Sequence, residues 1–237
     1  MKVDVTSLTT EKLAKLIDVS AVRATTTESD VREACQTAQR YGCASVSINP
    51  CFVALAAELV QGSGVQVDVS IAFPFGSATI ASKVFETRDA MSKGATEIDM
   101  VMTISKAKSG CWDHVRDDIK AVVEEAKGHD AGCIVKVILE NAYLTDDEKI
   151  RACLAARAAG ADFVKTSTGF AKADVYGATF ADVRLMYETV GDKMGVKAAG
   201  GIRSLDRALN MIEVGVTRMG ISVADEVMAS WEARHKE

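Results

Sequence analysis

The sequence lacks the features that mark membrane, secreted and nucleic-acid-binding proteins. No run approaches the roughly 18 apolar residues of a membrane span, and the start, M-K-V-D-V-T-S-L-T-T-E, lacks the uninterrupted apolar core of a signal peptide. The formal net charge is −5 with 26% charged residues, so no basic surface predicts nucleic-acid binding. We therefore expect a cytoplasmic protein with neither a membrane nor a nucleic-acid partner.

Metal-ligand and disulfide patterns are also missing. The six cysteines include no C-x-x-C pair, and the three histidines are not spaced from any cysteine as a zinc ligand set requires. In a chain without an export signal, such cysteines are typical of reduced, mostly buried small apolar residues. We expect no metal site.

Residues that interrupt secondary structure are few, and helix and strand patterns alternate from end to end. With only two prolines and no Ser/Gly-rich linker, the sequence predicts one domain over residues 1–237. A short opening helix is expected at about residues 9–16, and Thr9 or Thr10 is its candidate N-cap. Strand patterns follow near residues 16–20, 44–48, 65–73, 97–102, 133–139, 162–166, 195–198 and 217–220, and helical patterns fill the gaps.

A weak repeat marks the joints between helices and strands. It has the forms Y-G-C-A-S-V, K-G-A-T-E-I, A-G-A-D-F-V and V-G-V-T-R-M, in which the glycine suits the left-handed residue that ends a helix. Eight strand-helix units predict an α/β fold, a (β/α)8 TIM barrel with a short extra N-terminal helix, with a doubly wound open sheet as the lesser option. In such a barrel, reactive groups lie at the carboxyl ends of the strands.

Charged residues stand where an apolar strand residue is the ordinary choice. They are Asp18, Asp99, Lys136, Lys165 and Lys197, each in a different expected strand. Burying so many charges is costly unless they pair, so Asp18 and Asp99 are the natural partners of the lysines. A purely structural ion-pair network would explain them, but such networks at strand ends are also how enzymes shift pKa values.

Two lysines on adjacent strands suggest Schiff-base chemistry. An ordinary lysine has a pKa of about 10.4 and is protonated at neutral pH, whereas burial and a neighbouring cation both lower that value. One of Lys165 and Lys197 could then attack a carbonyl as a free amine and form an iminium. The sequence alone leaves open which of them attacks.

Three polar loops follow the last three strands. T-S-T-G (166–169), A-G-G-I-R (199–203) and M-G-I-S (219–222) supply backbone N–H groups, and their glycines allow an anion to approach closely. Loops in these positions, with a helix N-terminus, form the usual phosphate site of such barrels, to which Arg203 adds charge. A small phosphorylated substrate is the favoured interpretation.

At these residues the chain resembles the deoxyribose-phosphate aldolase family from about residue 16 to residue 222. The most specific motifs are E-I-D-M-V (97–101), F-V-K-T-S-T-G-F (163–170), G-V-K-A-A-G-G-I-R (195–203) and T-R-M-G-I-S (217–222). The resemblance implies reversible cleavage of 2-deoxy-D-ribose 5-phosphate to D-glyceraldehyde 3-phosphate and acetaldehyde, without cofactor or metal. It also implies a homodimer, although no stretch of the sequence identifies an interface.

The resemblance implies roles for individual residues. Lys165 resembles the Schiff-base lysine, Lys197 the second lysine that keeps it deprotonated, and Asp99 the carboxylate of the proton relay. The phosphate site would be lined by Gly169, Gly200, Gly201, Arg203, Gly220 and Ser222. We also expect Asp18, Ser20, Ser47, Lys136 and Thr166 to contribute to substrate binding.

Some positions depart from the family pattern, at Val19, Ser47, Ala199 and Val223. They change the pocket wall rather than the lysines, so a related Schiff-base aldolase acting on another phosphorylated sugar is an alternative. A sugar-phosphate-binding barrel with little catalysis is another, because binding needs the loops but no lysine of lowered pKa. A dehydrogenase is disfavoured because no G-x-G-x-x-G follows the first strand.

Overall fold

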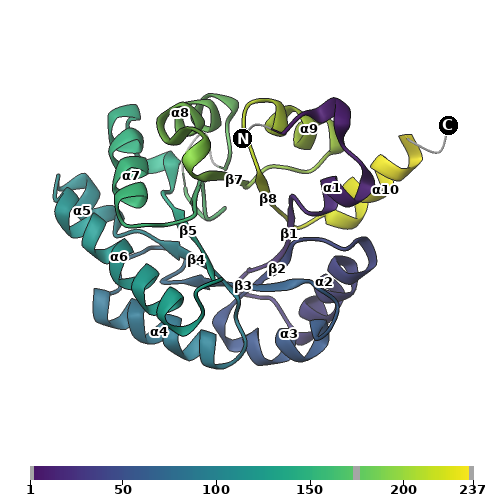
Figure 1. The fold of residues 1–237 in the computed structure, drawn as a ribbon, viewed down its shortest axis with the longest axis horizontal. Coiled ribbons are helices and arrows are strands. Elements are labelled where there is room, and N and C mark those ends of the chain that lie inside the picture. Colours follow the sequence, from purple (N-terminus) through teal and green to yellow (C-terminus); the bar gives the residue numbers. More distant parts are fainter. Residues whose placement is uncertain (1–2, 173–176, 235–237) are drawn as a thin grey trace.

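The computed structural model describes residues 3–172 and 177–234. Within these residues, eight parallel strands close into a barrel in chain order, with the helices around its outside (Figure 1). The strands are β1 (Ile17–Ala21), β2 (Ser45–Ile48), β3 (Gln66–Ile71), β4 (Glu97–Val101), β5 (Ile134–Ile138), β6 (Phe163–Lys165), β7 (Gly195–Ala199) and β8 (Arg218–Ile221). The predicted (β/α)8 barrel is confirmed, and the open sheet is wrong because β8 pairs with β1.

Helices fill the gaps between the strands, as predicted. They are α1 (Thr10–Ala14), α2 (Glu28–Tyr41), α3 (Val53–Val60), α4 (Ile80–Ser92), α5 (Ile104–Lys108), α6 (Trp112–His129), α7 (Asp146–Ala158), α8 (Phe180–Val190), α9 (Leu205–Glu213) and α10 (Ala224–Arg234), with 3-10 turns at Val5–Ser7, Pro50–Phe52, Asn141–Tyr143 and Gly191–Lys193. Thr9 caps α1, the predicted extra N-terminal helix. Capping boxes, each with a threonine at the N-cap, start α2 and α7. Among the helices described, none is long and apolar enough to cross a bilayer.

The repeated glycines occupy the expected backbone conformation. Gly42, Gly94, Gly160 and Gly215 all have positive φ, which is the left-handed region that ends a helix before the next strand. The same short joint therefore recurs around the barrel, before β2, β4, β6 and β8.

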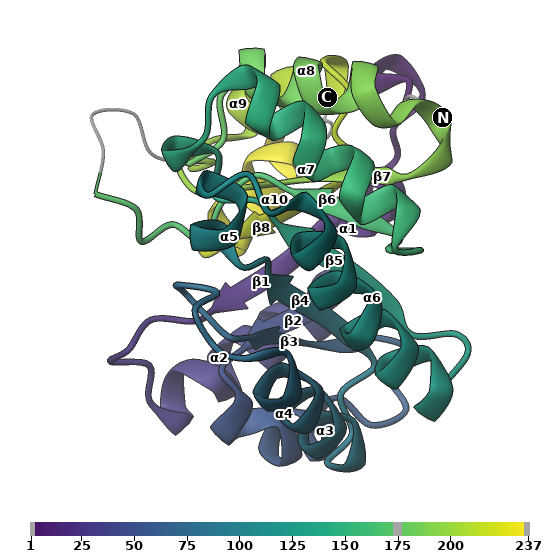
Figure 2. The same ribbon diagram turned by 90° about the vertical axis from the view of Figure 1, so that its left-hand side faces the viewer.

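Apolar and polar side chains alternate along β3, with the polar ones facing the inside of the barrel. In β3, Val67 and Val69 belong to the apolar core under the helices, whereas Asp68 contacts side chains from β2, β5 and β7. Contacts between strands that are not neighbours can be made only across the barrel interior. In β3, apolar side chains therefore point outward to the helices and polar ones inward. Figure 2 shows the barrel from the side, and the arrowhead of β1 marks the end at which the strand carboxyl ends gather.

Candidate active site

The barrel interior contains what we call the interior charge cluster. Among the described residues, it comprises four carboxylates and four cations, all at least nine-tenths buried: Asp18, Asp68, Glu97, Asp99, Lys136, Lys165, Lys197 and Arg218. Opposite charges are equal in number, so the cluster is formally neutral. Neutrality and direct pairing are what make so many buried charges tolerable.

Asp99 connects the three lysines of this cluster. Its Oδ2 lies 2.5 Å from Lys165 Nζ and 2.6 Å from Lys197 Nζ, and its Oδ1 lies 3.1 Å from Lys136 Nζ. Asp18 Oδ2 lies 2.6 Å from Lys197 Nζ. The prediction that Asp99 and Asp18 pair with the lysines is confirmed.

Lys165 and Lys197 lie side by side. They are register partners on β6 and β7, and because both amines contact one oxygen of Asp99, their nitrogens are at most about 5 Å apart, the range in which like charges disfavour protonation. Burial lowers the pKa of the Lys165 amine, the Asp99 carboxylate opposes this shift, and the Lys197 cation adds to it.

The pKa of Lys197 is shifted in the opposite direction. Burial alone would lower its pKa, but the carboxylates of Asp18, Asp68 and Asp99, at 2.6, 2.9 and 2.6 Å, together raise it. Asp68, Asp99 and Glu97 likewise overcome burial and raise the pKa of Lys136. The surroundings thus separate one lysine whose pKa is lowered from two whose pKa is raised, a distinction that the sequence alone could not make.

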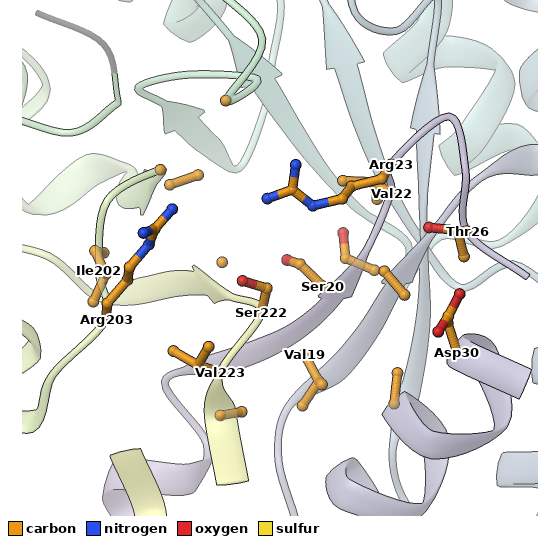
Figure 3. A pocket seen from close by; sticks show the side chains of 18 of the residues that line it. Val19, Ser20, Val22, Arg23, Thr26, Asp30, Ile202, Arg203, Ser222 and Val223 are labelled. Carbon is orange, nitrogen blue, oxygen red and sulfur yellow. The ribbon is translucent and has the colours of Figure 1, made fainter. Parts of the chain in front are cut away.

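A pocket of about 910 Å³ opens above the interior charge cluster at the carboxyl ends of the strands. It is lined by nine of the predicted site residues: Ser20, Ser47, Lys165, Gly169, Gly200, Gly201, Arg203, Gly220 and Ser222. Figure 3 shows the side chains of Ser20, Arg203 and Ser222 pointing into it. Of the three interior lysines, Lys165 is the one that lines the pocket, and it is 6% exposed.

Five predicted site residues are buried beneath the pocket instead of lining it, namely Asp18, Asp99, Lys136, Thr166 and Lys197. Four of them are charged members of the interior charge cluster. Thr166 has a different task, because its Oγ1 accepts from Ala199 N–H at 3.1 Å and donates to Ala199 O at 3.3 Å. Its hydroxyl ties the end of β6 to the end of β7, and so it supports the pocket floor.

Sequence reasoning missed three members of the interior charge cluster. Asp68 lies 3.1 Å from Lys136 Nζ, Glu97 lies 2.6 Å from the same nitrogen, and Arg218 Nη1 lies 2.7 Å from Asp18 Oδ1. The signal that could have found them is the one that identified Asp18 and Asp99, a charged residue inside an apolar strand pattern.

Glu140 was also missed. It is a non-glycine residue with a left-handed backbone (φ 56°), and its buried carboxylate accepts hydrogen bonds from both the N–H and the hydroxyl of Thr168. Burial raises the pKa of this carboxyl group. Since Thr168 lines the pocket beside Lys165, Glu140 holds the loop after β6 in place.

Gly200 allows two loops at the pocket rim to meet. Its φ is +84°, and a Cβ there would lie 2.7 Å from Gly177 Cα. Gly200→Ala is therefore expected to lower the free energy of unfolding by about 1–3 kcal/mol, measured by urea denaturation. Gly64→Ala is the matched control, because Gly64 has φ +78° with nothing within 4 Å of the added carbon. Equal losses in the two variants would contradict a role for the loop contact.

Comparison with known proteins places this arrangement in a family. The model for the DeoC/LacD family aldolase matches residues 12–224, which include every member of the interior charge cluster. The chain belongs to the DeoC/LacD aldolase family. It is accordingly an enzyme of the lyase class.

Similar proteins match this DeoC/LacD aldolase over nearly their whole length. Deoxyribose-phosphate aldolase of Caldanaerobacter subterraneus subsp. tengcongensis is 48% identical over 93% of this chain and 94% of that protein. Deoxyribose-phosphate aldolase 2 of Bacillus licheniformis is 47% identical over 95% of this chain and 98% of that protein. The solved structure of deoxyribose phosphate aldolase from Aeropyrum pernix, described as tetrameric, has a TM-score of 0.87 at 32% identity and covers 95% of this chain and 93% of that one.

Proposed function

We propose that this DeoC/LacD aldolase reversibly cleaves 2-deoxy-D-ribose 5-phosphate to D-glyceraldehyde 3-phosphate and acetaldehyde through a Schiff base on Lys165. The observation that carries the proposal is the position of Lys165. It combines a lowered pKa, contact with the carboxylate of Asp99 and direct access to a pocket rimmed by glycine loops. The names of the relatives support the substrate.

The chemistry begins with a neutral amine. Lys165 Nζ adds to the C1 aldehyde of the open-chain sugar, and loss of water gives an iminium. A base removes the C3 hydroxyl proton, the C2–C3 bond breaks, and its electron pair passes into the iminium to form an enamine, releasing D-glyceraldehyde 3-phosphate. Protonation of the enamine at C2 and addition of water then release acetaldehyde and restore the amine.

Asp99 and Lys197 supply the proton relay in this proposal. Asp99 Oδ2 contacts both amines, at 2.5 Å from Lys165 and 2.6 Å from Lys197, and the three lysines around it hold the pKa of its carboxyl group well below the usual range even though burial alone would raise it. Asp99 therefore stays anionic and can stabilise the cationic iminium. Lys197 stays protonated and can return a proton to Lys165 through the shared oxygen.

The phosphate would bind at the rim of the pocket. Gly169, Gly200 and Gly201 have positive φ, so their loops can turn backbone N–H groups toward an anion. Ser222 and Val223 lead directly into α10, whose N-terminus carries the positive end of the helix dipole. The Arg203 side chain points into the same space (Figure 3).

The direct test uses purified protein with 2-deoxy-D-ribose 5-phosphate and measures acetaldehyde release. Addition of borohydride during turnover should reduce the iminium and leave a stable adduct on Lys165, identified by peptide mass spectrometry. Cleavage without any adduct on a lysine would eliminate the Schiff-base route. Substrate binding with neither cleavage nor adduct would favour a sugar-phosphate-binding barrel.

A related Schiff-base aldolase for a different phosphorylated sugar is the second candidate. Val19, Ala199 and Val223, where the sequence departs from the family pattern, all line the pocket. Their side chains are apolar, so this part of the wall offers no side-chain hydrogen bonds to a substrate. An assay panel of phosphorylated aldehydes and ketoses decides between the two, and a ketose preferred over deoxyribose phosphate would select the second.

We further propose that the reaction needs no metal ion, because an iminium is itself the electron sink for carbon–carbon cleavage. Incubation with excess EDTA, followed by buffer exchange, is expected to leave the cleavage rate unchanged. A loss of activity that is restored by one divalent metal, and not by buffer alone, would contradict a purely lysine-based mechanism.

A further inference from the structure

Two arginine side chains enter the pocket from opposite walls. Arg203 comes from the loop after β7 and Arg23 from the loop after β1, and both line the pocket. In Figure 3 the two guanidinium groups point toward one another, with Ser222 and Ser20 near the space between them. Arg23 is not among the residues that the sequence motifs assign to phosphate.

Neither guanidinium group has a protein anion beside it. In the described part of the chain, no ion pair or side-chain hydrogen bond is formed by Arg23 or Arg203, although Asp30 and Glu33 line the same pocket. Two cations directed into one space repel each other, and an anion placed between them removes that repulsion. Both side chains are exposed to solvent and therefore available to a negatively charged ligand.

The backbone of Arg23 is held in place by two hydrogen bonds. Its carbonyl oxygen accepts hydrogen bonds from Asn49 Nδ2 at 3.1 Å and from Thr26 N–H at 3.0 Å. The contact with Asn49 joins the loop after β1 to the residue that follows β2. A long side chain on a braced loop loses less freedom on binding than one on a mobile loop.

We propose that Arg23 is a second phosphate-binding residue, facing Arg203 across the pocket, and that the pair sets the preference of this enzyme for phosphorylated over unphosphorylated sugar. The proposal rests on the proposed function, because it takes the anion to be the phosphate of the substrate. A phosphate monoester carries a charge of about −1.5 to −2 at neutral pH, which two guanidinium groups match better than one.

Carboxylates in another part of the pocket determine which way round the substrate would bind. Asp30 and Glu33, both on α2, line that part of the pocket. Like charge disfavours a phosphate there, so the anion is confined to the space between the two arginines. With the phosphate fixed at that end, the aldehyde end of the sugar is free to extend toward Lys165.

The test compares Arg23→Gln with the wild-type enzyme on 2-deoxy-D-ribose 5-phosphate and on 2-deoxy-D-ribose. The ratio of kcat/KM for the phosphorylated over the unphosphorylated sugar is expected to fall roughly 10- to 100-fold, because a charge-assisted hydrogen bond is lost, and the fall should lie mainly in KM for the phosphorylated sugar. Arg23→Lys should recover part of it. Arg32→Gln, an exposed arginine on α2, is the matched control and should leave the ratio unchanged.

A binding measurement separates this proposal from the proposed function. Inorganic phosphate should raise the unfolding temperature of the wild type and of Arg32→Gln, and raise that of Arg23→Gln much less. An unchanged kcat/KM ratio, or equal stabilisation of Arg23→Gln and wild type by phosphate, overturns the role of Arg23. If the wild type does not cleave deoxyribose 5-phosphate, the proposed function fails, and the phosphate-induced shift still decides whether Arg23 binds the anion.

Discussion

Replacement of Lys165 with leucine is expected to lower the rate of sugar-phosphate cleavage by more than about 10⁴-fold, the scale seen when a group that forms the covalent intermediate is removed. No other interior lysine can take its place. Lys136 and Lys197 are fully buried, and neighbouring carboxylates raise the pKa of each. The measurement is acetaldehyde release under single-turnover conditions, with borohydride trapping on the same samples.

The same variant should remain folded. Lys165 is the interior lysine whose pKa is lowered, so a neutral side chain of similar length changes the charge of the site less than it would at Lys197. Asp99 also keeps Lys136 and Lys197 as partners. We expect a smaller loss than the ~3–5 kcal/mol of a broken buried pair, measured by urea denaturation beside the surface control Lys120→Leu. Native-like turnover, or an adduct trapped on another lysine, would assign the Schiff base elsewhere.

Replacement of Lys197 with leucine is expected to damage both stability and activity. Asp18, Asp68 and Asp99 would lose a common cation at 2.6–2.9 Å, and leaving buried carboxylates short of a partner costs about 3–5 kcal/mol. At neutral pH the cleavage rate should fall roughly 10²- to 10⁴-fold, the range of a lost acid–base group. Stability is measured by urea denaturation. The cleavage rate is then expressed per amount of protein that remains folded.

The pH dependence distinguishes the electrostatic effect of Lys197 from simple disruption. Formation of the iminium needs the neutral amine, so kcat/KM rises with pH as Lys165 loses its proton. Removal of the Lys197 cation takes away one cause of the lowered pKa of Lys165 and leaves the opposing pull of Asp99. The rise should therefore move to higher pH in Lys197→Leu and stay nearer its original place in Lys197→Arg. Superimposable profiles for wild type and Lys197→Leu would refute the coupling between the two amines.

The sequence predicted the barrel because its signals are local. A threonine N-cap, a glycine at a helix-to-strand joint and a short apolar run each depend on a few neighbouring residues, and β1 to β8 lie within a residue or two of the expected positions. The charged strand residues Asp99 and Lys165 stood out for the same reason. Their pairing could be inferred because a buried charge needs a partner.

The contacts between distant strands could not be predicted from the sequence, because they form only when the barrel closes. The contacts of Asp68 with Lys136 and Lys197 join β3 to β5 and β7 across the interior, and no spacing along the chain encodes that distance. The depth of a side chain is equally hidden. Lys165 ends β6 and reaches the pocket, whereas Lys197 lies in the middle of β7 and does not.

The neutrality of the interior charge cluster has a consequence for redesign of this barrel. Glu97 and Arg218 contact each other, at 3.3 Å, but neither contacts Lys165 or Asp99. Exchanging the two together for uncharged residues removes one negative and one positive group, and leaves the remaining six in balance. Substitutions in the barrel interior should therefore replace one acidic and one basic residue together. Glu97 and Arg218 are the first choice, because neither contacts Lys165 or Asp99.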